Sequence, residues 1–273
     1  MHDDTMGYDE SPLRIQVMGV GKVGAEAVRK MAGKIYKVEC IVEEEVTAEI
    51  EDDIRKLHLL IVICSEAEPE AVSLALRLVT ISKVEYAVRV VLTDGQSSDG
   101  TSELPIWPPE VSRLVVKNEC LIPLYEDASG IMQQKGMRNI LFRLAVQSIT
   151  DIITQYQFVC VDFADVHFIM QSGGTALLGI GYGSRSERGA ADAVQNALSA
   201  INYCKNRFYV SGLIVTIYGS SSLTLDDFDS VVQIVSDDTD HDASLVVSIV
   251  LIEELGQNYR VSVVAMTNAV KLI

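Results

Sequence analysis

The sequence predicts an α/β protein in which a Rossmann-like parallel sheet, a long central helix and an α+β domain follow one another. Short β-branched runs alternate with segments of helical periodicity from residue 13 to residue 123, which is the pattern of βαβ units. One helical period then continues through residues 131–155. We therefore expect domains at residues 12–130 and 158–273, joined by a central helix at residues 131–157.

The first domain is expected to hold five strands and two main helices. The strands are apolar, β-branched runs between turn residues, and we place them at Leu13–Gly19, Lys37–Val42, Leu57–Cys64, Tyr86–Leu92 and Val115–Pro123. The helices are predicted at Lys22–Met31 and Pro69–Leu78, with a short further piece after Pro108 and Pro109. Residues 93–109 contain three prolines and neither Lys nor Arg, which predicts a long surface loop.

The central helix should bury one apolar face. This face is made by Ile140, Leu144, Ala145, Ile149, Ile152 and Ile153. The segments after it predict two helices and two strands, at Phe163–Gln171, Ala176–Gly181, Glu187–Tyr203 and Leu213–Ile217 in chain order.

The last part of the chain predicts a capped helix followed by a hairpin. Thr224 precedes Asp226 and Asp227, and a hydroxyl cap with acids in the first turn favours a helix start there. The closing strands, Leu245–Ile252 and Tyr259–Met266, flank a short turn and are expected to pair with each other.

The charge balance is strongly acidic. The 273 residues include 22 Lys+Arg and 38 Asp+Glu, so the net charge is −16, and a surface of this sign repels nucleic acid and anionic membranes. Between Glu43 and Glu70 there are ten acids and only two bases, and 2 − 10 = −8 is half of the total. A hydrophobic fraction of 48% and a mean hydropathy of +0.23 are sufficient for a folded core and exclude general disorder.

Targeting signals and metal-binding patterns are not recognised in the sequence. No apolar run approaches the roughly 18 to 20 residues that cross a bilayer, and the start is acidic, so we expect a cytoplasmic protein. The cysteines form no C-x-x-C pair and predict buried free thiols: Cys40, Cys64, Cys120, Cys160 and Cys204. His167 has no His or Cys partner at metal-ligand spacing, so no metal site is predicted.

A glycine-rich turn follows the first predicted strand. Gly19, Gly21 and Gly24 form a G-x-G-x-x-G pattern with Lys22 between them, just before a helix whose N–H groups can hold a phosphate. The pattern also fits a tight strand-to-helix turn without a ligand, or a site that has degenerated. If Glu43 or Glu44 binds a ribose, a dinucleotide-dependent enzyme is a further alternative.

Four later segments resemble FtsZ, the bacterial relative of tubulin. Residues 161–166, V-D-F-A-D-V, resemble its synergy loop, and residues 145–153 resemble the end of its central helix. Residues 223–228 and 259–266 resemble the start of a C-terminal-domain helix and the closing strand. The spacing also agrees, so the resemblance covers residues 13 to 267 and implies a tubulin/FtsZ-like fold.

This resemblance implies a GTPase that polymerises in cell division. It assigns nucleotide binding to Gly19, Gly21, Lys22, Gly24 and Asn139, and GTP or GDP as the ligand. It assigns catalysis to Asp162 and Asp165, which in the family act on the nucleotide of the next subunit. The same two acids also fit a simple helix cap, because Asp162 directly precedes a predicted helix.

The chain departs from the family where the nucleotide should lie. In place of the phosphate loop G-G-G-T-G-T-G it has residues 64–70, C-S-E-A-E-P-E, with no glycine and with Pro69, which lacks an amide donor. We expect Glu66, Glu68 and Glu70 to point into the phosphate space. The F-E-G-x-x-R stretch is missing, and Ile140 replaces the acid next to Asn139, so ordinary GTP binding should be lost.

The favoured hypothesis is therefore a pseudo-GTPase that modulates filaments. It would bind itself or a genuine FtsZ through the synergy-loop face, and any GTPase activity would depend on the nucleotide of a partner subunit. A weak GTP-binding, self-polymerising GTPase remains the alternative. The chain stops at Ile273, soon after the last predicted strand, without the family's linker and terminal peptide, so direct membrane binding is not expected.

Overall fold

A computed structural model describes most of the chain. It covers residues 12–81, 87–95, 106–117, 120–122, 136–155, 159, 161–171, 173–184, 188–205, 208–239 and 242–269. The two expected domain boundaries, near residues 130 and 157, lie outside these ranges, as do Cys160 and the first five residues of the predicted central helix.

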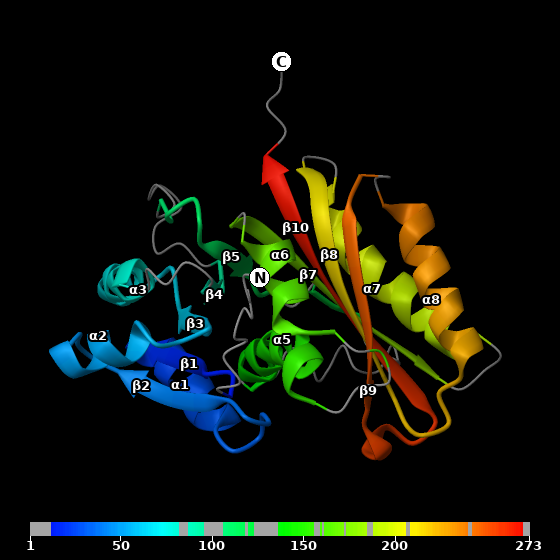
Figure 1. The fold of residues 1–273 in the computed structure, drawn as a ribbon, viewed down its shortest axis with the longest axis horizontal. Coiled ribbons are helices and arrows are strands. Elements are labelled where there is room, and N and C mark those ends of the chain that lie inside the picture. The colour runs from blue at the N-terminus through cyan, green and yellow to red at the C-terminus, as the bar shows by residue number, and fades with distance from the viewer. Residues whose placement is uncertain are drawn as a thin grey trace, which may run out of the picture.

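The described strands form one ten-stranded sheet (Figure 1). Their bounds are β1 Ile15–Val20, β2 Glu39–Glu43, β3 Leu59–Cys64, β4 Val88–Thr93, β5 Ser112–Val115, β6 Leu121–Ile122, β7 Gly174–Ser184, β8 Phe208–Gly219, β9 Ser244–Leu251 and β10 Asn258–Ala269. The order across the sheet is β2-β1-β3-β4-β5-β7-β10-β8-β9, and β6 pairs with β7. This mixed α/β architecture is the predicted fold class.

Helices cover this sheet. They are α1 Gly21–Met31, α2 Ala48–Ile54, α3 Pro69–Ile81, α5 Met137–Thr154, α6 Phe163–Met170, α7 Gly189–Lys205 and α8 Leu225–Asp238, with a 3₁₀ turn at Glu253–Leu255. In the first half β1 to β5 are parallel. Successive side chains of β1 enter different cores, because Val17 packs with α1 and α5 whereas Met18 packs with α2 and α3.

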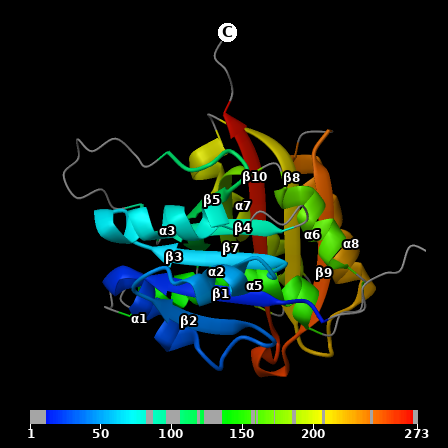
Figure 2. The ribbon, with the colours of Figure 1, turned by 60° about the vertical axis from the view of Figure 1, so that its left-hand side comes forward.

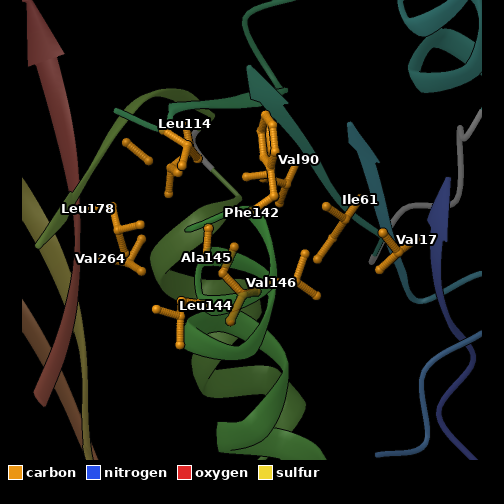
Figure 3. Packing of buried hydrophobic residues seen from close by; sticks show 14 of the residues in the cluster. Val17, Ile61, Val90, Leu114, Phe142, Leu144, Ala145, Val146, Leu178 and Val264 are labelled. Carbon is orange, nitrogen blue, oxygen red and sulfur yellow. The ribbon is translucent and has the colours of Figure 1, made fainter. Parts of the chain in front are cut away.

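The central helix α5 connects the two halves by its packing. Fourteen of its 18 residues are buried. Phe142, Leu144, Ala145 and Val146 pack in one core with β1, β3, β4 and β5 and with β7 and β10 (Figure 3). Figure 2 shows the strands of the first half crossing β10, β8 and β9 at a steep angle, with α5 between them. Ile140 was expected on the buried face but is 41% exposed.

The predicted hairpin of the last two strands is wrong. β10 lies between β7 and β8 and is antiparallel to both, whereas β9 is parallel to β8 at the sheet edge. The physical reason is burial. Residues 259–267 are all buried and need a neighbouring strand on each side, whereas most of β9 is only half-buried and suits an edge.

Two predictions in the first half also need correction. The strand predicted at Val115–Pro123 is replaced by β5, which begins at Ser112, and the two-residue β6, and residues 109–110 form a turn instead of a helix. Helix α2 was not predicted, because its many acids dilute the apolar period. Thr47 caps it by accepting a hydrogen bond from the Ile50 N–H at 3.3 Å.

Candidate functional site

The predicted site residues lie at two opposite edges of the parallel strands. We call the end where β1, β3 and β4 finish the carboxyl edge, and the end where they begin the amino edge. The glycine turn starts α1 at the carboxyl edge. α6 lies toward the amino edge, where the Phe163 ring meets His58 at 6.0 Å and Ser112 Oγ donates to the Met170 carbonyl at 3.2 Å. Within one chain the two sets of residues are therefore not brought together.

The glycines of the turn are required by close packing. A Cβ on Gly24 would overlap the carbonyl oxygen of Ile63, so glycine lets α1 approach β3. Gly21 has φ +68°, and a Cβ there would overlap the Glu68 carboxylate. A Cβ on Gly19 would likewise overlap the backbone of Gly24. The glycine pattern thus has a packing role that needs no ligand.

A carboxylate of the chain itself sits at the N-terminus of α1. Glu68 Oε2 accepts a hydrogen bond from the Lys22 N–H at 2.7 Å, and Glu68 Oε1 accepts one from the Val23 N–H at 3.3 Å. Such free N–H groups at a helix start, together with the helix dipole, are a general binding site for anions. Here the anion is the side chain of Glu68, supplied by the loop that follows β3.

The rest of the 64–70 loop is held by a buried ionic network. Glu66 forms an ion pair with Arg113 and accepts a hydrogen bond from Thr93 Oγ1 at 2.9 Å. Asp94 accepts a hydrogen bond from Ser65 Oγ at 2.8 Å and lies 3.6 Å from Arg138. The loop is thereby tied to β4, β5 and α5.

The expectation that three carboxylates point into the phosphate space needs correction. Only Glu68 reaches the N–H groups of α1. Glu66 is 8% exposed and turns toward β5, because the Arg113 guanidinium offers it a partner that the sequence did not reveal. Glu70 lies in the first turn of α3 and lines an open pocket beside α1.

This pocket, of about 580 Å³, brings charges of both signs together. Its charged lining residues are Lys22, Arg29, Glu43, Glu44, Glu45, Glu70 and Arg77. Burial raises the pKa of Glu43 above its ordinary value. Glu43 and Glu44 do line the same pocket as Gly21, which is the placement that the dinucleotide alternative requires. No group of three or more His, Cys, Asp or Glu within the described ranges could hold a metal ion.

Asn139 lies at a second pocket, between α1 and α5. Its Nδ2 donates to Glu26 Oε1 at 2.9 Å, while its buried Oδ1 has no hydrogen-bond partner. The pocket has a volume of about 590 Å³ and is also lined by Lys30, Lys34 and Arg143. Asn139 therefore lines a different pocket from Gly21 and Lys22, and Glu26 already uses one end of its amide.

Asp162 and Asp165 form a reciprocal cap at the start of α6. The Asp165 N–H donates to Asp162 Oδ1 at 3.1 Å, and the Asp162 N–H donates to Asp165 Oδ2 at 3.0 Å. This is the capping box, so the capping alternative considered for these acids is confirmed. Asp162 is nevertheless exposed, and on the same helix Phe168 is 59% exposed. Burial lowers the pKa of His167.

Sequence reasoning missed the network behind the 64–70 loop. One signal was available, since Ser65 and Asp94 each directly follow a buried strand. Because the carboxyl ends of neighbouring parallel strands meet, these two side chains were candidates for contact. Arg113 carried no such signal, because the predicted strand began at Val115, two residues after it, whereas β5 begins at Ser112.

No helix in the described part of the chain combines the length and apolar character that crossing a membrane requires. Residues 174–268 match the FtsZ family, C-terminal domain. Among solved structures, the FtsZ W319Y mutant of M. jannaschii has a TM-score of 0.76 at 21% identity, covering 94% of this chain and 91% of that chain.

Two further structures are also similar. An empty FtsZ dimer of M. jannaschii has a TM-score of 0.75 at 20% identity, covering 95% of this chain and 89% of that chain. CetZ from Methanosaeta thermophila strain DSM 6194 has a TM-score of 0.61 at 14% identity, covering 94% and 88%. The chain therefore has an FtsZ/tubulin-like fold, and its residues 174–268 match the C-terminal domain of the FtsZ family.

Proposed function

We propose that this FtsZ-like protein is a pseudo-GTPase that modulates the filaments of a genuine FtsZ. The observation that carries the proposal is the Glu68 carboxylate on the Lys22 and Val23 N–H groups. In the family resemblance these N–H groups face the nucleotide phosphates. A phosphate at this place would have to displace an anion that belongs to the chain.

The charge around the α1 N-terminus supports the same conclusion. Glu68 and Glu70 lie on the 64–70 loop, and Glu43, Glu44 and Glu45 line the adjoining pocket. Like charges a few ångströms apart repel by about 1 kcal/mol or more each at the effective dielectric of a protein surface. Lys22, Arg29 and Arg77 line the same pocket, but they are outnumbered by these five carboxylates, so a triphosphate gains little net attraction here.

The opposite edge supports a retained contact face. α6 presents Asp162, Ala164 and Phe168 to solvent, and its start is fixed by the capping box. A subunit with one working face joins a filament at one end and does not accept the next subunit through its altered face. A head-to-tail contact that cannot be repeated stops the filament from growing at that end. The protein would act as a capper or length modulator.

The alternative is a weak GTP-binding protein that polymerises with itself. Asn139 favours it, because its Oδ1 is buried without a partner and lines a pocket with Lys30, Lys34 and Arg143. A base that donates to Asn139 Oδ1 would satisfy this atom. Calorimetry with GTP and GDP at near-millimolar concentration separates the two proposals, since the pseudo-GTPase gives no heat of binding.

The decisive experiment mixes the chain with FtsZ from the same cell. Co-sedimentation, electron microscopy of filament length and GTP turnover are measured at increasing ratios of this chain to FtsZ. We expect shorter filaments at substoichiometric ratios, with this chain in the pellet. No co-sedimentation together with unchanged filament length and GTP turnover would contradict the proposal.

A further inference from the structure

A second ionisable cluster lies where α5 packs on the C-terminal sheet. We call it the α5 joint, and its members are Asp151 of α5, Thr216 and Tyr218 of β8, and Arg260 and Ser262 of β10. Arg260 lies directly opposite Tyr218, and Ser262 lies opposite Thr216, so all four strand residues share one face. Tyr218 Oη donates to the Gln147 carbonyl at 3.3 Å, which shows that this face is turned toward α5.

The joint is buried yet incompletely hydrogen-bonded. None of its five residues is more than 7% exposed. Among the described residues, four polar atoms in the joint make no hydrogen bond of normal geometry: Asp151 Oδ1, Thr216 Oγ1, Arg260 Nη2 and Ser262 Oγ. Buried polar atoms without partners are unfavourable, and charged ones most of all.

The two opposite charges of the joint do not neutralise each other by direct contact. The Arg260 guanidinium lies over the Tyr218 ring, with Cζ 3.7 Å from the ring centre, and forms no ion pair with Asp151 in the described structure. Burial therefore dominates and raises the pKa of Asp151 to about 6, although Arg260, Gln155, Tyr218 and Arg143 partly offset it. Burial likewise raises the pKa of Tyr218.

Other titratable groups near α5 are distant from Asp151. β9 also packs on α5 but contains no titratable residue. α1 meets the first half of α5, where Glu26 bonds Asn139, and the twelve residues from there to Asp151 correspond to about 18 Å of helix. The charged groups that act on Asp151 are thus Arg260 and Arg143, and the uncharged side chains of Gln155 and Tyr218 hydrogen-bond to it.

We propose that the α5 joint is a proton-operated conformational switch, in which a proton on Asp151 tightens the packing of α5 on the C-terminal sheet. At neutral pH the ionised carboxylate is buried with its Oδ1 unpartnered, and in this proposal the joint then loosens and admits water. The direction of the pH dependence follows from the coupling between proton binding and folding. A carboxyl group whose pKa is raised in the folded state binds its proton more tightly there, so stability falls as pH rises through about 6.

The test compares the wild-type chain with Asp151→Asn, which is isosteric and cannot ionise. Urea unfolding is measured from pH 5 to pH 8, with Asp229→Asn on the exposed side of α8 as the matched loss of one charge. We expect the folding constant of the wild type, relative to Asp151→Asn, to fall about tenfold between pH 5 and pH 7. The folding constant of the wild type relative to Asp229→Asn should change little over the same pH range.

Hydrogen exchange locates the effect. After correction for intrinsic rates, residues 141–155 and 258–267 of the wild type should exchange faster at pH 7.5 than at pH 5.5, and Asp151→Asn should remove the difference. A parallel pH dependence in the two proteins would overturn the proposal. If the variant does not fold, a carbon NMR titration of Asp151 in the wild type decides, since a midpoint near 3.8 contradicts the switch. These measurements involve no FtsZ, so their outcome is independent of the proposed function.

Discussion

The carboxyl edge and the start of α6 share one kind of contact, which has a different consequence at each place. At both places a carboxylate accepts hydrogen bonds from the free N–H groups of a helix start, Glu68 on α1 and Asp162 on α6. Asp162 is three residues from its partner and caps its own helix, whereas Glu68 comes from a loop 46 residues away. Because Asp162 caps its own helix, the exposed face of α6 stays free for contact. Glu68, in contrast, occupies N–H groups to which a ligand could bind.

The largest expected effect concerns the network that holds the 64–70 loop. Glu66→Ala leaves the partly buried Arg113 without its counter-charge, and we expect a loss of about 2 to 3 kcal/mol in the free energy of unfolding. Urea unfolding at pH 7 measures it. Glu51→Ala is the control, because Glu51 and its partner Arg55 are both exposed, at 37% and 53%, and the loss should stay below about 1 kcal/mol. Equal losses would show that the Glu66 contact does not anchor the loop.

Removing the distant carboxylate sharpens the comparison further. Glu68→Ala frees the Lys22 and Val23 N–H groups, and we expect a loss of about 1 kcal/mol in stability, typical of a missing cap. We also expect weak binding of inorganic phosphate in this variant and none in the wild type, measured by calorimetry. Glu70→Ala removes the same charge without freeing these donors. If both variants bind phosphate equally, general repulsion rather than Glu68 excludes the anion.

The last prediction concerns α6, where only a similarly small effect on stability is expected. Asp162→Ala should lower the free energy of unfolding by about 1 kcal/mol through loss of the capping box. Thr224→Ala removes the equivalent cap of α8 and should lower stability by a similar amount. Only Asp162→Ala should weaken co-sedimentation with FtsZ. An equal decrease in co-sedimentation of both variants would mean that Asp162 acts through stability alone and has no role in the contact face.

Much of the molecule was accessible from sequence because its signals are local. The caps at Thr224 and Asp162, the parallel strands and the buried central helix each depend on residues a few positions apart. The exposed Ile140 shows the limit, since its apolar spacing predicted burial, but no element in the described structure covers that side of α5 fully. The last two strands show another limit of the sequence. Two strands that follow each other in the chain across a short turn do not reveal whether a third strand lies between them in the sheet.

By itself the sequence determined the FtsZ/tubulin-like fold, the lack of glycine in residues 64–70 and the pair of acids at the start of α6. Only the tertiary structure decided which carboxylate reaches α1, that Arg113 draws Glu66 away, and that Asp151 is buried beside Arg260 without a direct ion pair. The physical reason is distance along the chain. Caps and amphipathic faces depend on neighbours within a few residues, whereas these charge contacts join segments 46, 47 and more than 100 residues apart, whose meeting depends on the packing of the whole sheet.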